Sequence, residues 1–319
     1  MTPAARDRGS GPGVPGESVP DDRPAHAALG SHRGAFGPAE WGLVALVATI
    51  WGSSFLFIAI GIEGLRPGLV VFLRILLGAL TLVVLPKARA PVPRDAWPRI
   101  AVFGVVWMAV PFLLFPIAEQ WVPSSVAGMV NGAMPVAAAV VVAIMTRHRP
   151  GRVQAVGIAT GFAGIVCISL PEVAGAGASP LGVALVVVAV ICYAVGATIA
   201  APLQQEFGTL PVVLRGQLVA LAVSVPGALL AWDGSTFTPA SLLAMVPLGV
   251  LGSGVAFVAM VSLVGRVGAD RGSIGIYFVP VFALALGVSV RGEPVHAISV
   301  VGCALVIAGA WLTSRGRSG

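Results

Sequence analysis

The sequence predicts an all-α polytopic membrane protein in which ten transmembrane helices form two inverted five-helix repeats. Three observations lead to this prediction. Hydrophobic residues make up 57% of the 319 residues and charged residues only 10%, whereas a soluble domain carries about 25% charged residues. Long uncharged runs recur along the chain, and about 20 helical residues cross the ~30 Å hydrocarbon core of a bilayer. The third observation is an internal repeat.

The repeat joins residues 103–165 to residues 248–310, which align without a gap at an offset of 145 positions (249 minus 104). Identical residues fill 13 of the 63 aligned positions. They include the pairs Gly104 and Gly249, Phe112 and Phe257, Pro135 and Pro280, Gly157 and Gly302, and Gly164 and Gly309. A duplicated membrane-spanning half is typical of secondary transporters, which move one half against the other around a site near the bilayer midplane.

The first 38 residues contain no apolar stretch and are rich in Gly, Pro, Ser, Asp and Arg. This composition predicts a disordered cytoplasmic tail rather than a signal peptide. Ten apolar spans follow, and they are expected near 41–60, 68–86, 100–118, 125–146, 153–170, 181–202, 210–232, 239–263, 273–290 and 297–313. Residues 41–170 then hold the first repeat and residues 181–313 the second. A transmembrane β-barrel is excluded because its strands alternate apolar and polar residues.

Basic residues predict the orientation of these spans in a plasma membrane. With a cytoplasmic N-terminus, the cytoplasmic side receives all but four of the 19 Lys and Arg residues; the exceptions are Arg66, Arg74, Arg215 and Arg291. Cytoplasmic loops are enriched in Lys and Arg, so we expect both termini in the cytoplasm. Each half has an odd number of spans, so the second half is inverted relative to the first, which suits alternating access.

Several motifs resemble those of the drug/metabolite transporter superfamily with two EamA repeats. They are Trp51-Gly52-Ser53-Ser54-Phe55 in the first span, Pro67 followed by Arg74, the run 249–257, and Val279-Pro280-Val281-Phe282 followed by Gly292-Glu293-Pro294. The resemblance covers residues 41–313 and implies ten helices, inverted repeats, and export or exchange of small metabolites. One departure is that Arg147 and His148 stand where the family usually carries Gly-Glu after the fourth helix.

Arg74, Asn131 and Gln217 are polar side chains placed deep in the predicted spans. An unpaired arginine facing lipid costs about 2.5–3.5 kcal/mol or more, so Arg74 is expected to face the bundle interior or a cavity. There it either attracts a substrate carboxylate or pairs with Glu63, Glu119 or helix-end carbonyls. The two amides contact either a neighbouring helix or a substrate. We count these three residues, with Ser54 of the first motif, among the expected substrate-binding residues.

Aromatic side chains away from the span ends are the other candidates for a binding site. Trp51, Phe112, Tyr193, Phe257 and Tyr277 lie deep in their spans, and we count them among the expected substrate-binding residues; Trp107 is equally deep. A site for apolar or aromatic metabolites needs such walls and a few polar groups that orient the ligand. Ordinary core packing is the alternative for each of them.

Pro135 and Pro280 interrupt the fourth and ninth spans at equivalent positions. Proline inside a helix removes a backbone hydrogen bond and produces a kink. We therefore predict that these two helices gate opposite faces of the membrane. In the fifth span, Gly157, Gly161 and Gly164 form a small-residue face that packs either within the protomer or in a homodimer.

Other function classes receive less support from the sequence. The basic residues lie in short loops between apolar runs rather than in a nucleic-acid-binding patch. The three cysteines lack metal-ligand spacing, and no Walker A motif is present. We therefore expect a lipid bilayer and a small-molecule substrate as partners, with no nucleic acid, metal, cofactor or catalytic residue. An intramembrane enzyme and a non-transporting membrane subunit are the alternatives to an exporter.

Overall fold

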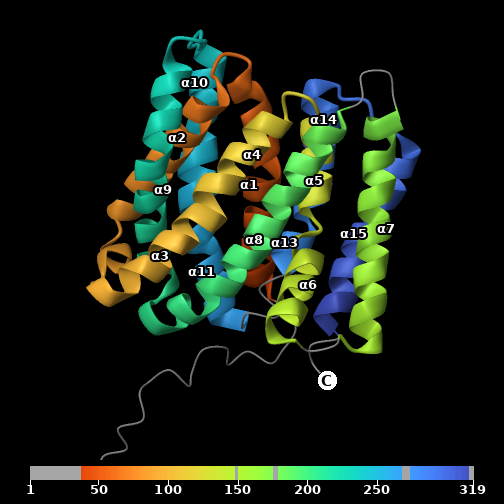
Figure 1. Ribbon diagram of the computed structural model, residues 1–319, viewed down its shortest axis with the longest axis horizontal. Coiled ribbons are helices and arrows are strands. Elements are labelled where there is room, and N and C mark those ends of the chain that lie inside the picture. The colour runs from red at the N-terminus through yellow and green to blue at the C-terminus, as the bar shows by residue number, and fades with distance from the viewer. Residues whose placement is uncertain (1–36, 148–149, 175–178, 268–273, 316–319) are drawn as a thin grey trace, which may run out of the picture.

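The computed structural model describes residues 37–147, 150–174, 179–267 and 274–315, and these residues form a bundle of helices without a strand (Figure 1). The predicted tail lies outside the described residues, apart from its last two positions. The helices are α1 (Pro38–Ile62), α2 (Pro67–Val83), α3 (Trp97–Gly104), α4 (Val110–Ala118), α5 (Ser124–Asn131), α6 (Met134–Thr146), α7 (Arg152–Ala174), α8 (Pro180–Phe207), α9 (Thr209–Trp232), α10 (Pro239–Val246), α11 (Ala256–Val267), α13 (Ile274–Tyr277), α14 (Val279–Arg291) and α15 (Ala297–Arg315).

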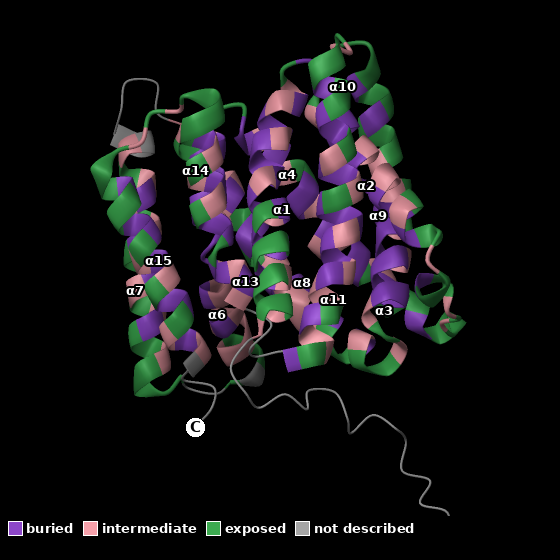
Figure 2. Ribbon diagram, turned by 180° about the vertical axis from the view of Figure 1, so that it is seen from behind, coloured by how far each residue is buried: buried purple, intermediate pink, exposed green. Residues whose placement is uncertain are grey.

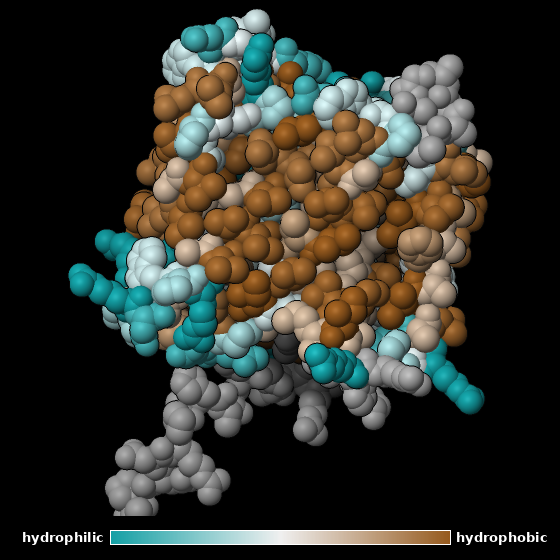
Figure 3. All heavy atoms as spheres, viewed as in Figure 1, coloured by the Kyte–Doolittle hydropathy of each residue, from teal (hydrophilic) through white to brown (hydrophobic). Residues whose placement is uncertain are grey.

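All ten predicted spans fall on these helices, and eight helical stretches of the described chain are long and apolar enough to cross a membrane. A ninth is obtained if α5 and α6, bent by 41° at a short break, form one span. Helix α2, with 17 residues, is apolar but shorter. The all-helical membrane fold is thus confirmed, while the count of ten spans stays a prediction. Figure 3 shows the apolar band between hydrophilic ends.

Local sequence signals explain where several helices begin and end. Proline occupies the first position of α1, α2, α8 and α10, where its missing N–H would have no helical partner and its fixed φ suits the helix. Gly208, at φ 83°, ends α8. Gly292 ends α14 at φ 64°, and the repeat-equivalent Arg147 ends α6 at φ 53°. Both positions are left-handed, a conformation that glycine adopts without steric cost.

The two halves share further irregularities at equivalent positions. A π-helical stretch, η4 (Val105–Ala109), joins α3 to α4, and a second, η5 (Pro247–Val255), joins α10 to α11. The break between α5 and α6 precedes Pro135, and the break between α13 and α14 precedes Pro280. Each proline thus lies at the second position of a new helix rather than inside a continuous one. The predicted interruption occurs at both sites, and a bend above 40° occurs at the first.

Helices α7 and α15 pack closely at one edge of the bundle (Figures 1 and 2). Gly157 lies against Gly309, and Gly164 lies against Gly302; a Cβ added to Gly164 would approach the Gly302 carbonyl oxygen to 2.6 Å. Because the contact partner moves back along α15 as α7 advances, the two helices run antiparallel. Small residues permit this backbone approach. The small-residue face of the fifth span therefore packs within the protomer.

One end of the bundle, which we call the Glu63 end, joins residues 62–67, 118–124, 232–239 and 291–297 and lies at the top of Figure 1. Arg291 Nη1 lies 2.7 Å from Glu63 Oε1. Arg66 Nε donates to the Gly234 carbonyl over 3.2 Å, and the Thr236 N–H donates to the Gly64 carbonyl over 2.7 Å. These contacts tie the first half of the chain to the second at this end.

Candidate functional site

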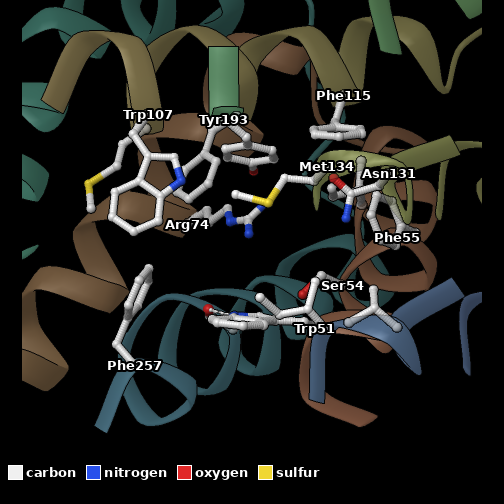
Figure 4. A pocket seen from close by; sticks show the side chains of 16 residues that line it. Trp51, Ser54, Phe55, Arg74, Trp107, Phe115, Asn131, Met134, Tyr193 and Phe257 are labelled. Carbon is white, nitrogen blue, oxygen red and sulfur yellow. Dashed lines mark hydrogen bonds between the residues drawn. The ribbon is translucent and has the colours of Figure 1, made fainter. Parts of the chain in front are cut away.

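A cavity inside the bundle has a volume of about 130 Å³ (Figure 4). Its walls come from both halves of the chain: α1, α2, α4, α5, α6 and η4 in the first, and α8, η5, α11, α13 and α14 in the second. The side chains that line it are Trp51, Ser54, Phe55, Ile58, Arg74, Trp107, Met108, Phe112, Phe115, Asn131, Met134, Tyr193, Gly252, Phe257, Ile276 and Val279. The cavity is therefore mainly aromatic and aliphatic.

Arg74 is the one cationic side chain on the described cavity wall, and it is 6% exposed. Its Nε donates to Ser253 Oγ over 3.1 Å, and its guanidinium carbon lies 3.8 Å from the centre of the Phe112 ring. Figure 4 shows the guanidinium near the middle of the cavity. The nitrogens that Ser253 leaves free can bind a carboxylate, because a guanidinium presents five N–H donors in a planar fork.

The π-helical stretch η5 supplies the support for Arg74. Gln217 of α9 is fully buried and its Nε2 donates to the carbonyl oxygen of Ser253. Trp51 Nε1 donates to the carbonyl oxygen of Gly252 over 3.1 Å. π-Helical turns expose backbone carbonyls to such partners and recur at functional sites. Gln217 therefore acts on the cavity indirectly, by holding the residue that Arg74 contacts.

Aromatic rings form a connected wall around the guanidinium. Trp51 and Phe257 meet edge to face at 5.8 Å between ring centres, and Phe257 meets Trp107 at 5.9 Å. On the other side, Tyr193 stacks on Phe115 at 5.8 Å. Such pairs stabilise their arrangement by about 0.5–1.5 kcal/mol beyond the burial of apolar area. The wall can hold an apolar or aromatic group of a ligand while Arg74 holds a charged one.

Two polar side chains lie close to this aromatic wall. Ser54 Oγ donates to the Ile50 carbonyl over 3.0 Å, and its lone pairs can still accept a hydrogen bond. Asn131 ends α5 at the break before α6, and its Oδ1 has no hydrogen-bond partner among the described residues. A buried amide oxygen without a donor costs free energy, so a ligand N–H donor would be favoured at this position.

The structure brings seven of the nine predicted binding residues together at the cavity: Trp51, Ser54, Arg74, Phe112, Asn131, Tyr193 and Phe257. Gln217 lies behind the wall, as described above. Tyr277 packs with Val136 and Ala310, away from the cavity. The gating prolines lie at the breaks, and Pro280 contacts Gly132 of the other break: a Cβ on Gly132 would lie 2.8 Å from Pro280 Cγ.

Several cavity residues were not among the predicted ones. Phe55 lies one helical turn after Trp51 in the same motif, so a search for residues on the face of Trp51 could have found it. Trp107 was recognised as a deep aromatic residue but was not counted as a binding residue. Met108 follows it in the π-helical stretch η4, whose register cannot be predicted from the sequence. Met134, Ile276 and Val279 are apolar residues beside helix breaks. Only the packing of distant helices assigns these residues to the cavity.

An ionic cluster lies at the Glu63 end, next to the cavity. The Glu293 carboxylate accepts hydrogen bonds from the backbone N–H of Ser124 over 3.0 Å and of Ser125 over 2.9 Å, at the start of α5. Burial acts to raise the pKa of Glu293, but hydrogen bonds from Ser125 and Ser124 outweigh it and leave the pKa below its ordinary value. Arg291 contacts both Glu63 and Glu293.

Glu119 caps the end of α4 between this cluster and the cavity. It is 9% exposed, and neither carboxylate oxygen has a hydrogen-bond partner among the described residues. Burial, and then the negative charge of Glu293, raise its pKa well above the ordinary value, while Arg74 and Arg291 oppose the shift. The acid named as a possible partner of Arg74 thus does not form an ion pair with it; Arg74 contacts Ser253 and Phe112 instead.

Comparison with protein families finds the EamA-like transporter family twice in this chain, at residues 41–170 and 180–315. The first match has the same bounds as the first expected repeat, and the second begins one residue before and ends two residues after the second expected repeat, 181–313.

Individual relatives cover most of the chain. It is 24% identical over 281 residues to an "uncharacterized transporter" of Archaeoglobus fulgidus, covering 87% of this chain and 99% of that protein. It is 28% identical to a "probable terminal-alkyne amino-acid exporter" of Streptantibioticus cattleyicolor, covering 87% and 93% of the two chains. It is 26% identical to the Escherichia coli inner membrane transporter YedA, covering 84% and 88%. A solved crystal structure with 18% identity and a TM-score of 0.62 covers 88% of this chain and 98% of its own, which shows the fold.

Proposed function

Because the chain belongs to the EamA-like transporter family, we propose that it is a secondary transporter that exports small amphipathic metabolites, amino acids or related compounds, by alternating access. The observation on which this proposal depends is the cavity, in which a single buried arginine faces an aromatic wall built from both halves of the chain. A ligand with one carboxylate and one apolar group matches this arrangement. The curated name of the Streptantibioticus relative, an amino-acid exporter, supports the same class.

The proposed mechanism requires two inverted halves of five spans each. The exchange of contacts between α7 and α15 supports inversion, because Gly157 contacts Gly309, the equivalent of Gly164, and Gly302, the equivalent of Gly157, contacts Gly164. A two-fold axis between two related elements produces this reciprocity. The equivalent breaks before Pro135 and Pro280 support the repeat itself. We propose that these breaks act as hinges, with α2 as the tenth span.

The proposed orientation places the Glu63 end outside and both termini in the cytoplasm, since most basic residues then lie on the cytoplasmic side. The cluster of Glu63, Arg291 and Glu293 then closes the outer face. Export follows if the cavity loads from the cytoplasm and empties outward when this cluster separates. A homodimer and an enzymatic activity are not part of the proposal.

Counterflow in proteoliposomes tests the function. Vesicles loaded with an unlabelled amino acid are expected to accumulate the labelled compound transiently, whereas protein-free vesicles are not. The variant Ser54→Trp fills the cavity and is expected to abolish counterflow while eluting as a monodisperse peak in detergent. Equal counterflow by Ser54→Trp would place the transport path elsewhere. Conversion of the compound to a product without flux would favour the enzyme alternative. Depletion of the compound from the medium of expressing cells would indicate import rather than export.

A further inference from the structure

We propose that Glu119 is a proton-binding group of the outer gate, so that the outer face closes with uptake of one proton and opens with its release. This inference rests on the proposed transport function and on the orientation assigned above. It adds a pH-sensitive gate, which the sequence did not suggest because every acid lies at a span edge or in a loop.

The position of Glu119 is the first argument. It follows α4 directly, its N–H donates to the Phe115 carbonyl over 2.9 Å, and Phe115 lines the cavity. On the other side lies the cluster of Arg291 and Glu293. The carboxyl group therefore lies between the substrate cavity and the contacts that hold the Glu63 end closed.

The surroundings of the carboxyl group are the second argument. The charged groups that act on it are Arg74 from α2, Arg291 at the end of α14, and Glu293 just after that helix. Arg74 is bound to Ser253, and Arg291 is bound to Glu63 on α1. From α8, Tyr193 stacks on Phe115 one turn away. Neither cation pairs with Glu119, and a buried carboxylate without a hydrogen bond is strongly disfavoured relative to the protonated group. In this conformation the group consequently holds a proton.

Linkage fixes the direction of the pH effect. When the outer face opens, water reaches Glu119 and its pKa falls toward the ordinary value of about 4.5. The closed conformation, with the raised pKa, is therefore favoured at low pH and loses its advantage as pH rises from about 4.5 through the raised value. Each unit of pKa difference between the two conformations changes their ratio by up to about tenfold.

The second half of the chain lacks a matching group. Residue 264, the repeat equivalent of Glu119, is valine. The inner face would accordingly close without proton binding at this position, and a proton exchanged at Glu119 passes to and from the outer solution. The asymmetry allows the external pH to bias the outer gate alone.

Thiol labelling as a function of external pH tests the inference without any substrate. In a chain with Cys167, Cys192 and Cys303 replaced by alanine, Ser125→Cys places a thiol at a fully buried position beside Glu293. A membrane-impermeant maleimide is applied to right-side-out vesicles between about pH 5 and pH 8. The variant Gln120→Cys, at an exposed position of the turn between α4 and α5, corrects for the pH dependence of the thiol reaction itself.

The corrected labelling of Ser125→Cys is expected to rise about tenfold over this range for each unit of pKa difference between the open and closed forms. It is expected to stay low and flat after Glu119→Gln, and to rise again after Glu119→Asp, which keeps a titrating group. A flat profile with Glu119 present, or the same rise after Glu119→Gln, overturns the inference. Absence of counterflow for every amino acid would instead overturn the proposed function, because the labelling needs no transport.

Discussion

Replacing Arg74 is the most direct test of the cavity. The side chain is 6% exposed and offers its free guanidinium nitrogens to the cavity. A hydrogen bond to a charged group contributes about 1.5–3 kcal/mol net, and each 1.4 kcal/mol is a factor of ten in affinity. Arg74→Met keeps most of the side-chain volume but removes the charge. We expect it to weaken the binding of a carboxylate-bearing substrate by about 10- to 150-fold.

The assay compares phenylalanine with phenylalaninamide as competitors of counterflow. The amide keeps the ring and the amino group but lacks the carboxylate. The wild-type protein is expected to prefer phenylalanine, and Arg74→Met is expected to bind the two compounds equally. Arg74→Lys keeps the charge and loses the planar fork of donors, so its preference should be intermediate.

Arg215→Met is the matched control. Arg215 also lies within a span, but its guanidinium donates to the carbonyl oxygens of Ala90 over 2.7 Å and of Pro211 over 3.1 Å, away from the cavity. This variant should keep the wild-type preference. If Arg74→Met also keeps it, Arg74 does not bind the substrate carboxylate, and its role is limited to its contacts with Ser253 and Phe112.

Three further predictions concern the repeat. Arg147→Gly should raise the free energy of unfolding by about 1 kcal/mol, since Arg147 is left-handed at φ 53°. Gly292→Ala should lower it by a similar amount. Thermal unfolding in detergent measures both variants, and melting-temperature shifts of the same sign would contradict the prediction. Gly164→Leu should lower the free energy of unfolding by about 1–3 kcal/mol or more through overpacking, because a Cβ there meets the Gly302 carbonyl oxygen at 2.6 Å. The control is Gly42→Leu, where nothing lies within 4 Å, and it should leave the melting temperature near that of the wild type. The double variant Pro135→Ala/Pro280→Ala should slow counterflow because continuous helices remove the proposed hinges, and transport at the wild-type rate and affinity would refute the gating role.

Much of the fold was predictable because membrane helices follow from local composition. Each span must satisfy its own backbone hydrogen bonds in hydrocarbon, so an uncharged run of sufficient length becomes a helix whatever its neighbours are. The aligned prolines and glycines indicated equivalent breaks and contacts in the two halves, and both occur at the predicted positions. Polar residues deep in spans were sound candidates for the same reason, since hydrocarbon disfavours them.

The sequence by itself determined the class of the protein, the repeated halves and the placement of Arg74 away from lipid. The tertiary structure decided which side chains meet: it brought Trp107 and Phe115 to the cavity and placed Tyr277 and Gln217 outside it. It also left the buried Glu119 carboxylate without a hydrogen-bond partner among the described residues. These outcomes depend on the rotation of each helix about its axis. That rotation is set by contacts between helices that are distant in the chain. It cannot be predicted from nearly uniform apolar runs, because such runs do not distinguish one helix face from another.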